Sequence, residues 1–396
     1  MRVIFNGLPA YSPKTGVGIY VANLLEELRQ IAGEDAVAAF PSGISALAAG
    51  IGGKLRAIKQ RKAASGGGSG GRSVKRRAAG LARSAVQHVY ARSFARMCRR
   101  GKFDLYHEPN FIPWECDLPT VITVHDLSVV LHPEWHPRDR VKFHERHFQR
   151  SLERCAHVLT VSECMRRDLI AAMGFSPSKV TAVANGVRAD LRQLTASDLA
   201  PVRAKLGLPA DYLLYVGTIE PRKNILTLLR AYSALNSRTR LLCPLVLAGG
   251  WGWGYAKERA YFEDEARHRS VIHLGYVADD DLPALYSGAT ALVYPSHYEG
   301  FGLPPVEMMA CGGAVLASTA PALREVCGNR AHFIDPNNDT GWRDAMRRVI
   351  EDADWRAELR TGVVKHAQQY SWRRCADEIW QVYESIAHPE SRSRAA

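Results

Sequence analysis

The sequence lacks the features that mark several special classes of protein. Its eight cysteines include no CxxC pair and no cluster with histidine at metal-ligand spacing, so neither a zinc site nor a disulfide framework is predicted. No stretch approaches about 18 uninterrupted apolar residues, so no membrane-spanning helix is expected. The beginning of the chain, Met1 to Gly7, reads as a short strand and turn, too short for the apolar core of a signal peptide. These absences favour a reduced, cytoplasmic protein.

Acidic residues are missing from one long segment of the chain. Between Ala36 and Phe103 there are fifteen Lys or Arg and no Asp or Glu. Since fifteen of the 52 basic residues lie there, the rest of the chain has 37 basic against 40 acidic residues, and the net charge of +12 arises in this one segment. The excess of positive charge must therefore be explained by this segment and not by the protein as a whole.

The basic segment has two parts that can be interpreted physically. Ser65 to Gly71 is a glycine-rich, flexible loop, and Val74 to Met97 has the spacing of an amphipathic helix with many arginines. A helix of this kind lies on anionic lipid, so residues 54–102 are predicted to bind the inner-membrane surface. The alternative is a solvated basic helix. Specific nucleic-acid binding is disfavoured, because the segment has no recognisable binding module and few aromatic residues among its charges.

What the chain does contain predicts an α/β protein of two domains. Its 396 residues exceed one ordinary core, and 46% hydrophobic with 23% charged residues is a globular composition. Strand-like and helix-like segments alternate, which favours parallel sheets. A polar stretch from Leu191 to Pro209 is interpreted as the linker. We therefore predict one domain at 1–195, with the basic insertion at about 42–100, a second at 205–372, and a final helix and frayed tail at 373–396.

The stretch from Tyr298 to Glu307, with the sequence YEGFGLPPVE, is the most informative motif. An apolar run from Ala289 to Tyr294 precedes it and Gly312-Gly313 follow, which predicts a strand, a glycine loop and a helix. Glu299 is then expected at the strand end and Glu307 in the first helical turn. Free backbone N–H groups between them would make an anion site flanked by two acceptors for hydroxyl groups. The alternative is that Glu307 only compensates the helix dipole and Glu299 is an ordinary loop residue.

Three weaker motifs accompany this stretch. Thr15-Gly16-Val17-Gly18 reads as a glycine turn before a helix from Ile19 to Ile31, or as an ordinary βα turn. His125-Asp126 ends a predicted strand, where ligands gather in parallel sheets, and the alternative is a core histidine satisfied by Asp126. Asp279-Asp280-Asp281 contains the DxD pattern that holds a divalent metal in some sugar-transferring enzymes. Here it is interpreted as N-capping of the following helix, so no metal is predicted.

The order of these motifs resembles one family. Two consecutive α/β domains with the glycine turn, the His125-Asp126 strand end, the loop Pro221-Arg222-Lys223-Asn224 and the stretch Glu299 to Glu307 resemble the retaining nucleotide-sugar glycosyltransferases of family 4. The similarity is to the bacterial mannosyltransferase-like branch that builds O-antigen or exopolysaccharide, and it spans the chain apart from the basic segment. It implies the GT-B fold, in which two Rossmann-like parallel-sheet domains face each other across a cleft.

The resemblance implies a donor site built mainly by the second domain. Glu307 would hold the ribose hydroxyls, and Glu299 would contact hydroxyls of the transferred sugar. Arg222 and Lys223 would neutralise the diphosphate, which removes the need for a metal. His125 would lie beside the reacting sugar, either orienting it or acting as a base. The other donor-binding residues that the resemblance implies are Gly16, Gly18, Tyr276, Val277, Gly300, Phe301, Gly302 and Leu303.

The reaction implied by the resemblance moves a hexose to a glycan or polyprenyl-linked acceptor, with no cofactor. Mannose from GDP-mannose is the expected donor sugar, and a UDP-hexose such as UDP-glucose is the alternative. The alternatives from other classes are a non-catalytic scaffold, which the intact Glu299, Glu307 and Lys223 argue against, and a pyridoxal-dependent phosphorylase, whose chains are usually much longer. Thr218 stands where many relatives have Arg, so one phosphate contact of the family is in doubt, and Asn6 stands where Asp is common.

Overall fold

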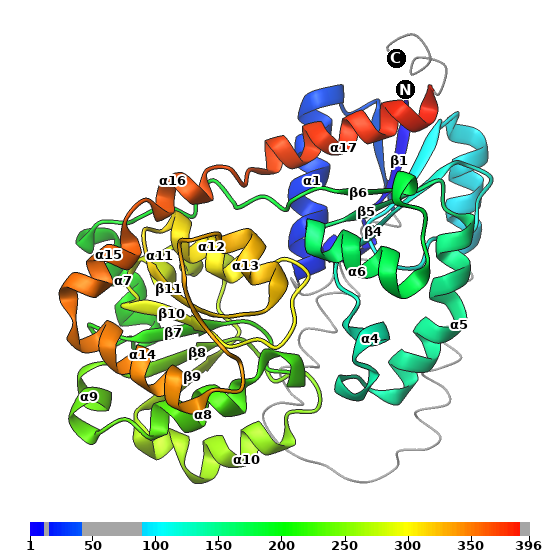
Figure 1. The fold of residues 1–396 in the computed structure, drawn as a ribbon. Helices are drawn as coiled ribbons and strands as arrows, with labels where there is room; N and C mark the ends of the chain where they lie inside the picture. Colours follow the sequence, from blue (N-terminus) through cyan, green and yellow to red (C-terminus); the bar gives the residue numbers. More distant parts are fainter. Residues whose placement is uncertain (12–15, 42–88, 389–396) are drawn as a thin grey trace.

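Two parallel sheets form the centre of the protein (Figure 1). The computed structural model describes residues 1–11, 16–41 and 89–388. Within them the first sheet has the strand order β2-β1-β3-β4-β5-β6 and the second β12-β11-β10-β7-β8-β9, with parallel pairing throughout. The strands of the first sheet are β1 (Val3–Asn6), β2 (Val37–Phe40), β3 (Leu105–Glu108), β4 (Thr120–Val124), β5 (His157–Thr160) and β6 (Val180–Ala182). Those of the second are β7 (Leu213–Val216), β8 (Leu245–Ala248), β9 (Val271–Gly275), β10 (Ala291–Tyr294), β11 (Ala314–Ser318) and β12 (His332–Ile334).

Helices cover both faces of each sheet. In Figure 1, α11, α12 and α13 lie on one side of the second sheet, and α8 and α10 lie on the other. The helices around the first sheet are α1 (Gly16–Ala32), α4 (Ser128–Leu131), α5 (Arg138–Arg154) and α6 (Glu163–Met173). Those that follow are α7 (Ala196–Leu206), α8 (Ile225–Ser233), α9 (Ser237–Leu242), α10 (Ala256–Asp264), α11 (Leu282–Ser287), α12 (Leu303–Ala310), α13 (Pro321–Cys327), α14 (Asp339–Glu351), α15 (Ala353–Arg360), α16 (Val363–Ala367) and α17 (Trp372–Ala387).

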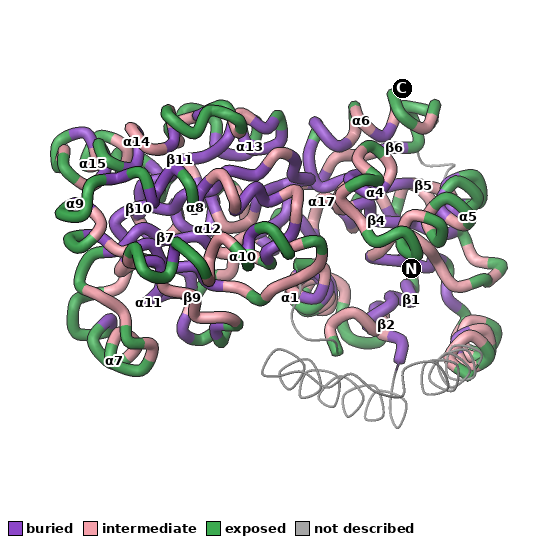
Figure 2. Tube along the Cα trace, turned by 90° about the horizontal axis from the view of Figure 1, so that it is seen from below, coloured by how far each residue is buried: buried purple, intermediate pink, exposed green. Residues whose placement is uncertain are grey.

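Burial of the strands explains why the alternation of strands and helices could be predicted from the sequence. Every residue of β1, β4, β10 and β11 is buried, because helices exclude water from both faces and each strand is then a continuous apolar run. Figure 2 shows the same pattern, with buried residues along both sheets and exposed residues on outer helices such as α7 and α9. The predicted α/β architecture of two parallel sheets is confirmed.

The last helix, α17, packs against the part of the molecule that contains the first sheet. It runs beside α1 (Figure 1), where Trp372 meets the ring of Tyr20 edge to face at 5.8 Å. Tyr383 forms a buried hydrogen bond of 2.5 Å with Nδ1 of His107, a residue of β3. Where the chain crosses back, Gly186 lies so close to Trp372 that a Cβ would be 2.2 Å from its backbone nitrogen. The two segments that join the sheets therefore touch.

The polar stretch interpreted as the linker, residues 191–209, lies between β6 of the first sheet and β7 of the second, and it contains the helix α7. Thr195 and Asp198 form a reciprocal capping box at the start of α7, and Gly207 ends it with a φ of 63°. A capping box satisfies two otherwise unpaired backbone donors, which favours a helix even in a polar sequence. Leu199 is buried, and α7 packs against α11.

Most of the basic segment lies outside the described residues. The predicted loop Ser65 to Gly71 is among the residues not described, as is the predicted helix from Val74 up to residue 88. Residues 89–101 are helical, and their Phe94 is fully buried against Tyr106 and Phe40. Among the helices that the structure describes, none combines the length and the apolar character needed to cross a membrane.

Candidate active site

The glycine loop between β10 and α12 differs in register from the expectation. Gly302 has a φ of 97°, and the helix begins directly after it at Leu303, with proline in the first turn. Glu307 is therefore in the second turn and not in the first, because Leu303 and the prolines after it already belong to the helix. Glu299 lies in the loop 295–302 and not at the end of the strand.

Glu299 binds two cations at once. Its Oε1 lies 2.5 Å from Nζ of Lys223, and its Oε2 lies 2.7 Å from a terminal nitrogen of Arg222. Lys223 also donates to the hydroxyl of Tyr294 at 2.8 Å, and Nε of Arg222 pairs with Glu220 at 2.6 Å. The structure thus brings together three residues predicted from the sequence, Glu299, Arg222 and Lys223. It adds two that were missed, Glu220 and Tyr294.

Burial gives this cluster its electrostatic character. Glu299 is 6% exposed and Lys223 is 7% exposed. Burial alone would raise the pKa of Glu299, but the charges of Arg222 and Lys223 outweigh it and hold that pKa at about 2. Burial and the neighbouring Arg222 lower the pKa of Lys223, and burial raises the pKa of Glu220. At neutral pH Glu299 is therefore a permanent carboxylate, and each of its oxygens faces a cation.

The loop after β7, which carries these two cations, is held in place by hydrogen bonds. Pro221–Lys223 form a 3₁₀ turn, and Asn224 follows with a φ of 57°. The amide of Asn224 donates to the carbonyls of Pro295 at 3.2 Å and Pro336 at 2.7 Å. Asparagine tolerates this left-handed backbone while its side chain bonds elsewhere. The Pro221-Arg222-Lys223-Asn224 motif is thus tied to the loop that carries Glu299.

Glu307 has a different environment from Glu299. Its Oε2 accepts a hydrogen bond of 2.6 Å from the hydroxyl of Tyr286, and the side chain is 7% exposed. Burial raises the pKa of Glu307, against the opposing effects of Tyr286 and the charge of Arg188. The two glutamates of the motif therefore have no partner in common, and each has its own set of contacts.

His125 is held in one tautomer by the backbone. Its Nε2 lies 2.8 Å from the carbonyl oxygen of Pro109. Because a carbonyl only accepts, Nε2 carries the proton and Nδ1 of the neutral ring is an acceptor. Burial lowers the pKa of His125, so the neutral ring is favoured. The alternative of a histidine satisfied by Asp126 is wrong, since Asp126 accepts from the backbone N–H and the hydroxyl of Ser128, at 2.9 Å and 2.5 Å.

The backbone of His125 meets the glycine loop directly. A Cβ on Gly300 would lie 1.7 Å from the carbonyl oxygen of His125. The carbonyl of Gly300 accepts a 2.6 Å hydrogen bond from the hydroxyl of Ser162, the residue before α6. Glycine is required here because loops following strands of the two different sheets touch. The sequence contained no signal for this contact.

The remaining donor-binding predictions fall on three short segments. Gly16 and Gly18 belong to α1 itself and do not form a turn, and a Cβ on Gly16 would meet nothing within 4 Å. Tyr276 is 54% exposed and Val277 is buried, just after β9. Gly302 precedes α12, and a Cβ there would collide with Leu323. The other two predicted loop residues are Phe301, which packs edge to face on Tyr370, and Leu303, the first residue of α12.

The acidic triplet is not a helix cap. Asp281 precedes α11, but its side chain makes no capping hydrogen bond. Both of its oxygens accept from Nζ of Lys205, a residue of α7, at 2.9 Å and 2.8 Å. The expectation of N-capping is wrong because the neighbouring helix offers a cation to this carboxylate.

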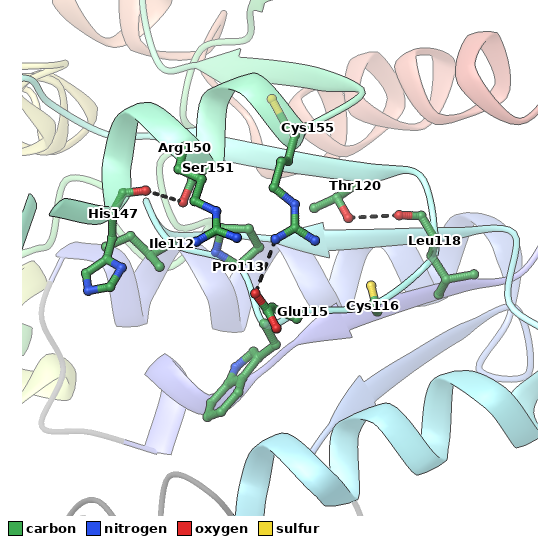
Figure 3. Close-up of a pocket in the computed structure, with 12 residues that line it drawn as sticks. Ile112, Pro113, Glu115, Cys116, Leu118, Thr120, His147, Arg150, Ser151 and Cys155 are labelled. Carbon is green, nitrogen blue, oxygen red and sulfur yellow. Dashed lines mark hydrogen bonds and ion pairs between the residues drawn. The ribbon is translucent and has the colours of Figure 1, made fainter.

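Two surface pockets lie in the first domain and contain none of the predicted residues. The one in Figure 3 is lined by the loop between β3 and β4 and by α5, where Arg154 pairs with Glu115 at 3.2 Å. The neighbouring pocket is lined by residues that include Asn110, Phe111 and His144. Asn110 directly follows Pro109, whose carbonyl holds His125. The same loop therefore lines the second pocket and holds His125 of the candidate site.

Comparisons with known proteins agree with this architecture. Residues 14–191 match the model "Glycosyltransferase Family 4" and residues 202–369 match "Glycosyl transferases group 1". O-antigen chain mannosyltransferase B of Escherichia coli is 33% identical over 399 residues, which cover 98% of this chain and 100% of that protein. The serotype-specific mannosyltransferase WbdA of Escherichia coli is 29% identical over 67% of this chain and 33% of its own length. Among solved structures, Anabaena Alr3699/HepE in complex with UDP and glucose has a TM-score of 0.68 at 18% identity, covering 97% of this chain and 100% of that one.

Proposed function

The chain belongs to the glycosyltransferases with the GT-B fold, and we propose that it transfers mannose from GDP-mannose to a glycan or polyprenyl-linked oligosaccharide in O-antigen or exopolysaccharide synthesis. The proposal includes retention of the anomeric configuration and no requirement for a metal ion. The choice of mannose as the transferred sugar is supported by the full-length similarity to a protein described as an O-antigen chain mannosyltransferase.

One observation carries the proposed donor site, and it is the pair of cations on Glu299. Arg222 and Lys223 lie on one carboxylate at 2.7 Å and 2.5 Å, in a largely buried setting. In the proposed complex, Arg222 and Lys223 donate some of their hydrogen bonds to the diphosphate. Preorganised cations stabilise negative charge where it develops on a leaving group, and this is usually the largest contribution to catalysis. Glu299 then turns to hydroxyls of the transferred sugar.

The bond changes of the proposed reaction follow from retention. The bond between C1 of the sugar and the diphosphate oxygen breaks, and the acceptor hydroxyl oxygen bonds to C1 on the same face. The proton of that hydroxyl passes to the leaving diphosphate. His125 offers Nδ1 as an acceptor and is assigned to orienting a sugar hydroxyl, since a pKa lowered by burial disfavours its protonated form.

Glu307 is assigned to the ribose of the donor. A short, rigid carboxylate accepts hydrogen bonds from two neighbouring hydroxyls. Tyr286 already occupies Oε2 at 2.6 Å, which fixes the direction of the other oxygen. Phe301, Gly302 and Leu303 are assigned to the distal phosphate, because their backbone N–H groups come before or at the first residue of α12 and have no partner within the helix.

A thermal-shift panel followed by a transfer assay tests the proposal. GDP-mannose, GDP, UDP-glucose and UDP are compared, because a ligand at a hundred times its Kd adds about 2.7 kcal/mol of stability. Transfer to a lipid-linked oligosaccharide is then followed with and without EDTA, and the anomer is read by NMR. An inverted product, loss of activity with EDTA, or a preference for UDP-glucose would each overturn the corresponding part of the proposal.

The basic segment is assigned to the membrane surface. We propose that residues 54–102 hold the enzyme at anionic lipid, where a polyprenyl-linked acceptor is found. The support is the fifteen basic residues without an acidic one between Ala36 and Phe103. Each well-placed Lys or Arg contributes about 1 kcal/mol near an anionic surface. In the described part of this segment, residues 89–101 form a helix that exposes Arg92, Arg96, Arg99 and Arg100.

A further inference from the structure

The two peptide neighbours of Glu299 are both held by helix α6, which packs on the other sheet. On one side, the hydroxyl of Tyr298 donates to Oδ2 of Asp168 at 3.1 Å. On the other side, the carbonyl of Gly300 accepts from the hydroxyl of Ser162 at 2.6 Å. Tyr298 and Ser162 are 8% and 3% exposed, so water does not readily replace these partners. Glu299 is therefore fixed between two hydrogen bonds that cross from one domain to the other.

A third contact reinforces the same helix end. Glu325, from α13, accepts hydrogen bonds from the backbone N–H groups of Glu163 and Cys164, at 2.7 Å and 2.6 Å. These N–H groups belong to the first turn of α6, where backbone N–H groups have no partner within the helix. A carboxylate at this position is also favoured by the helix dipole. The start of α6 is thus bound at three points to the second domain.

We infer that α6 positions Glu299 for the donor, through the hydrogen bonds of Ser162 and Asp168 to its two neighbours in the chain. The inference rests on the proposed function, because it gives Glu299 the transferred sugar as its substrate contact. Ser162, Asp168 and Glu325 are positioning residues that touch no reacting atom. Separation of the domains breaks their hydrogen bonds and leaves the loop around Glu299 held from one side only, by Arg222 and Lys223.

Ser162 allows the positioning role to be separated from a role in folding. Its hydroxyl oxygen accepts from the N–H of Met165 as the N-cap of α6, and the same hydroxyl donates to Gly300. Asp is as good an N-cap as Ser but has no hydroxyl to donate. Ser162→Asp therefore keeps the helix cap and removes the contact between domains. Ser162→Thr keeps both, and is the conservative variant expected to restore function.

The experiment compares Ser162→Asp and Tyr298→Phe with Ser162→Thr and wild type, with Glu163→Gln as a matched control. Glu163 lies on the same helical turn, and its side chain pairs only with Arg166 of the same helix. The first two variants are expected to lose turnover by about tenfold or more, within the usual range of coupling between sites. Affinity for the nucleotide sugar falls, affinity for GDP alone stays unchanged, and the melting temperature stays near that of wild type.

Hydrogen exchange of the segment 298–303 gives a readout that does not depend on catalysis. Faster exchange of this segment in Ser162→Asp, but not in Ser162→Thr or Glu163→Gln, supports the inference. Exchange and turnover that match wild type overturn it, as does an equal loss of affinity for GDP and for the nucleotide sugar. If wild type transfers no sugar while exchange still rises in Ser162→Asp, the proposed function fails and the sugar-site inference falls with it, although the contact itself remains.

Discussion

Lys223 and Glu299 form a buried ion pair, with Nζ 2.5 Å from Oε1, although 76 residues separate them in the chain. The pair joins the loop after β7 to the loop after β10, two neighbouring strands of the second sheet. Arg222 binds the other oxygen of the same carboxylate. This arrangement gives Glu299 a structural role beside its proposed contact with the sugar, and the two roles require different substitutions to be told apart.

Glu299→Gln is expected to lower turnover by about a hundredfold, because the charge that organises Arg222 and Lys223 is lost. Glu299→Ala is expected to do the same and also to lower the free energy of unfolding by about 3 to 5 kcal/mol, since it leaves the buried Lys223 without its carboxylate and Arg222 with Glu220 alone. Turnover and urea unfolding are measured for both. Glu265→Gln, which removes an exposed helical ion pair with Arg269, is the control. Wild-type turnover in Glu299→Gln would remove this residue from the site.

Gly300→Ala is expected to abolish most activity, because its Cβ would be 1.7 Å from the carbonyl oxygen of His125. The loops of the two domains must then separate, and a displacement of about 1 Å commonly costs a hundredfold in rate. Gly250→Ala is the matched control, since a Cβ there meets nothing within 4 Å. Steady-state turnover is compared for the two variants. Equal activity would show that the contact between the loops is not needed.

Glu307→Gln is expected to raise the donor KM by about tenfold with little change in kcat, the pattern of a contact made equally in the ground and transition states. The amide keeps the hydrogen bond from Tyr286 but is a poorer acceptor for ribose hydroxyls. Donor titrations at saturating acceptor give both constants. Asp280→Asn, at an exposed position of the acidic triplet, is the control. A fall in kcat at unchanged KM would contradict the ribose assignment.

Stability is expected to decrease as the pH rises from 4.5 to about 8 because of Glu108. Burial raises the pKa of this carboxyl from its ordinary value of 4.5 to about 8, so the folded state binds its proton more tightly than the unfolded state. The resulting stabilisation is fully present below pH 4.5 and is lost as the pH rises through 8. Urea unfolding at several pH values measures it. Glu108→Gln should flatten the dependence across this range, and an unchanged slope would refute the assignment.

Binding to vesicles is expected to require anionic lipid and to weaken with salt. Replacing Arg92, Arg96 and Arg99 by Gln should lower affinity by about a hundredfold, at roughly 1 kcal/mol for each residue. Co-sedimentation at low and high salt measures this. Arg343, Arg347 and Arg373, replaced in the same way, provide a control of equal charge outside the segment. Equal affinities for the two triple variants, or no binding at low salt, would contradict the membrane assignment.

The sequence by itself determined the architecture and identified the residues of the proposed donor site. Both strand faces are covered by helices, so each strand is an apolar run that alternates with an amphipathic helix, and this alternation is local information. The pair Glu299 and Glu307 was identified from residue types and spacing, and the motif Pro221 to Asn224 from the resemblance to family 4. The ends of helix α6 are also encoded locally, by the Ser162 cap and by Gly174.

Only the tertiary structure decided which groups meet. Burial and contact between distant segments, such as Gly300 against His125 or Asp281 with Lys205, leave no periodic pattern in the sequence. The same limit explains why Asp281 was interpreted as a cap. A carboxylate's role is set by the partners that folding brings within about 4 Å, since Coulombic attraction and desolvation both depend on that environment. Glu299 was recognised from its neighbours in the chain, but its partners Arg222 and Lys223 follow from the fold.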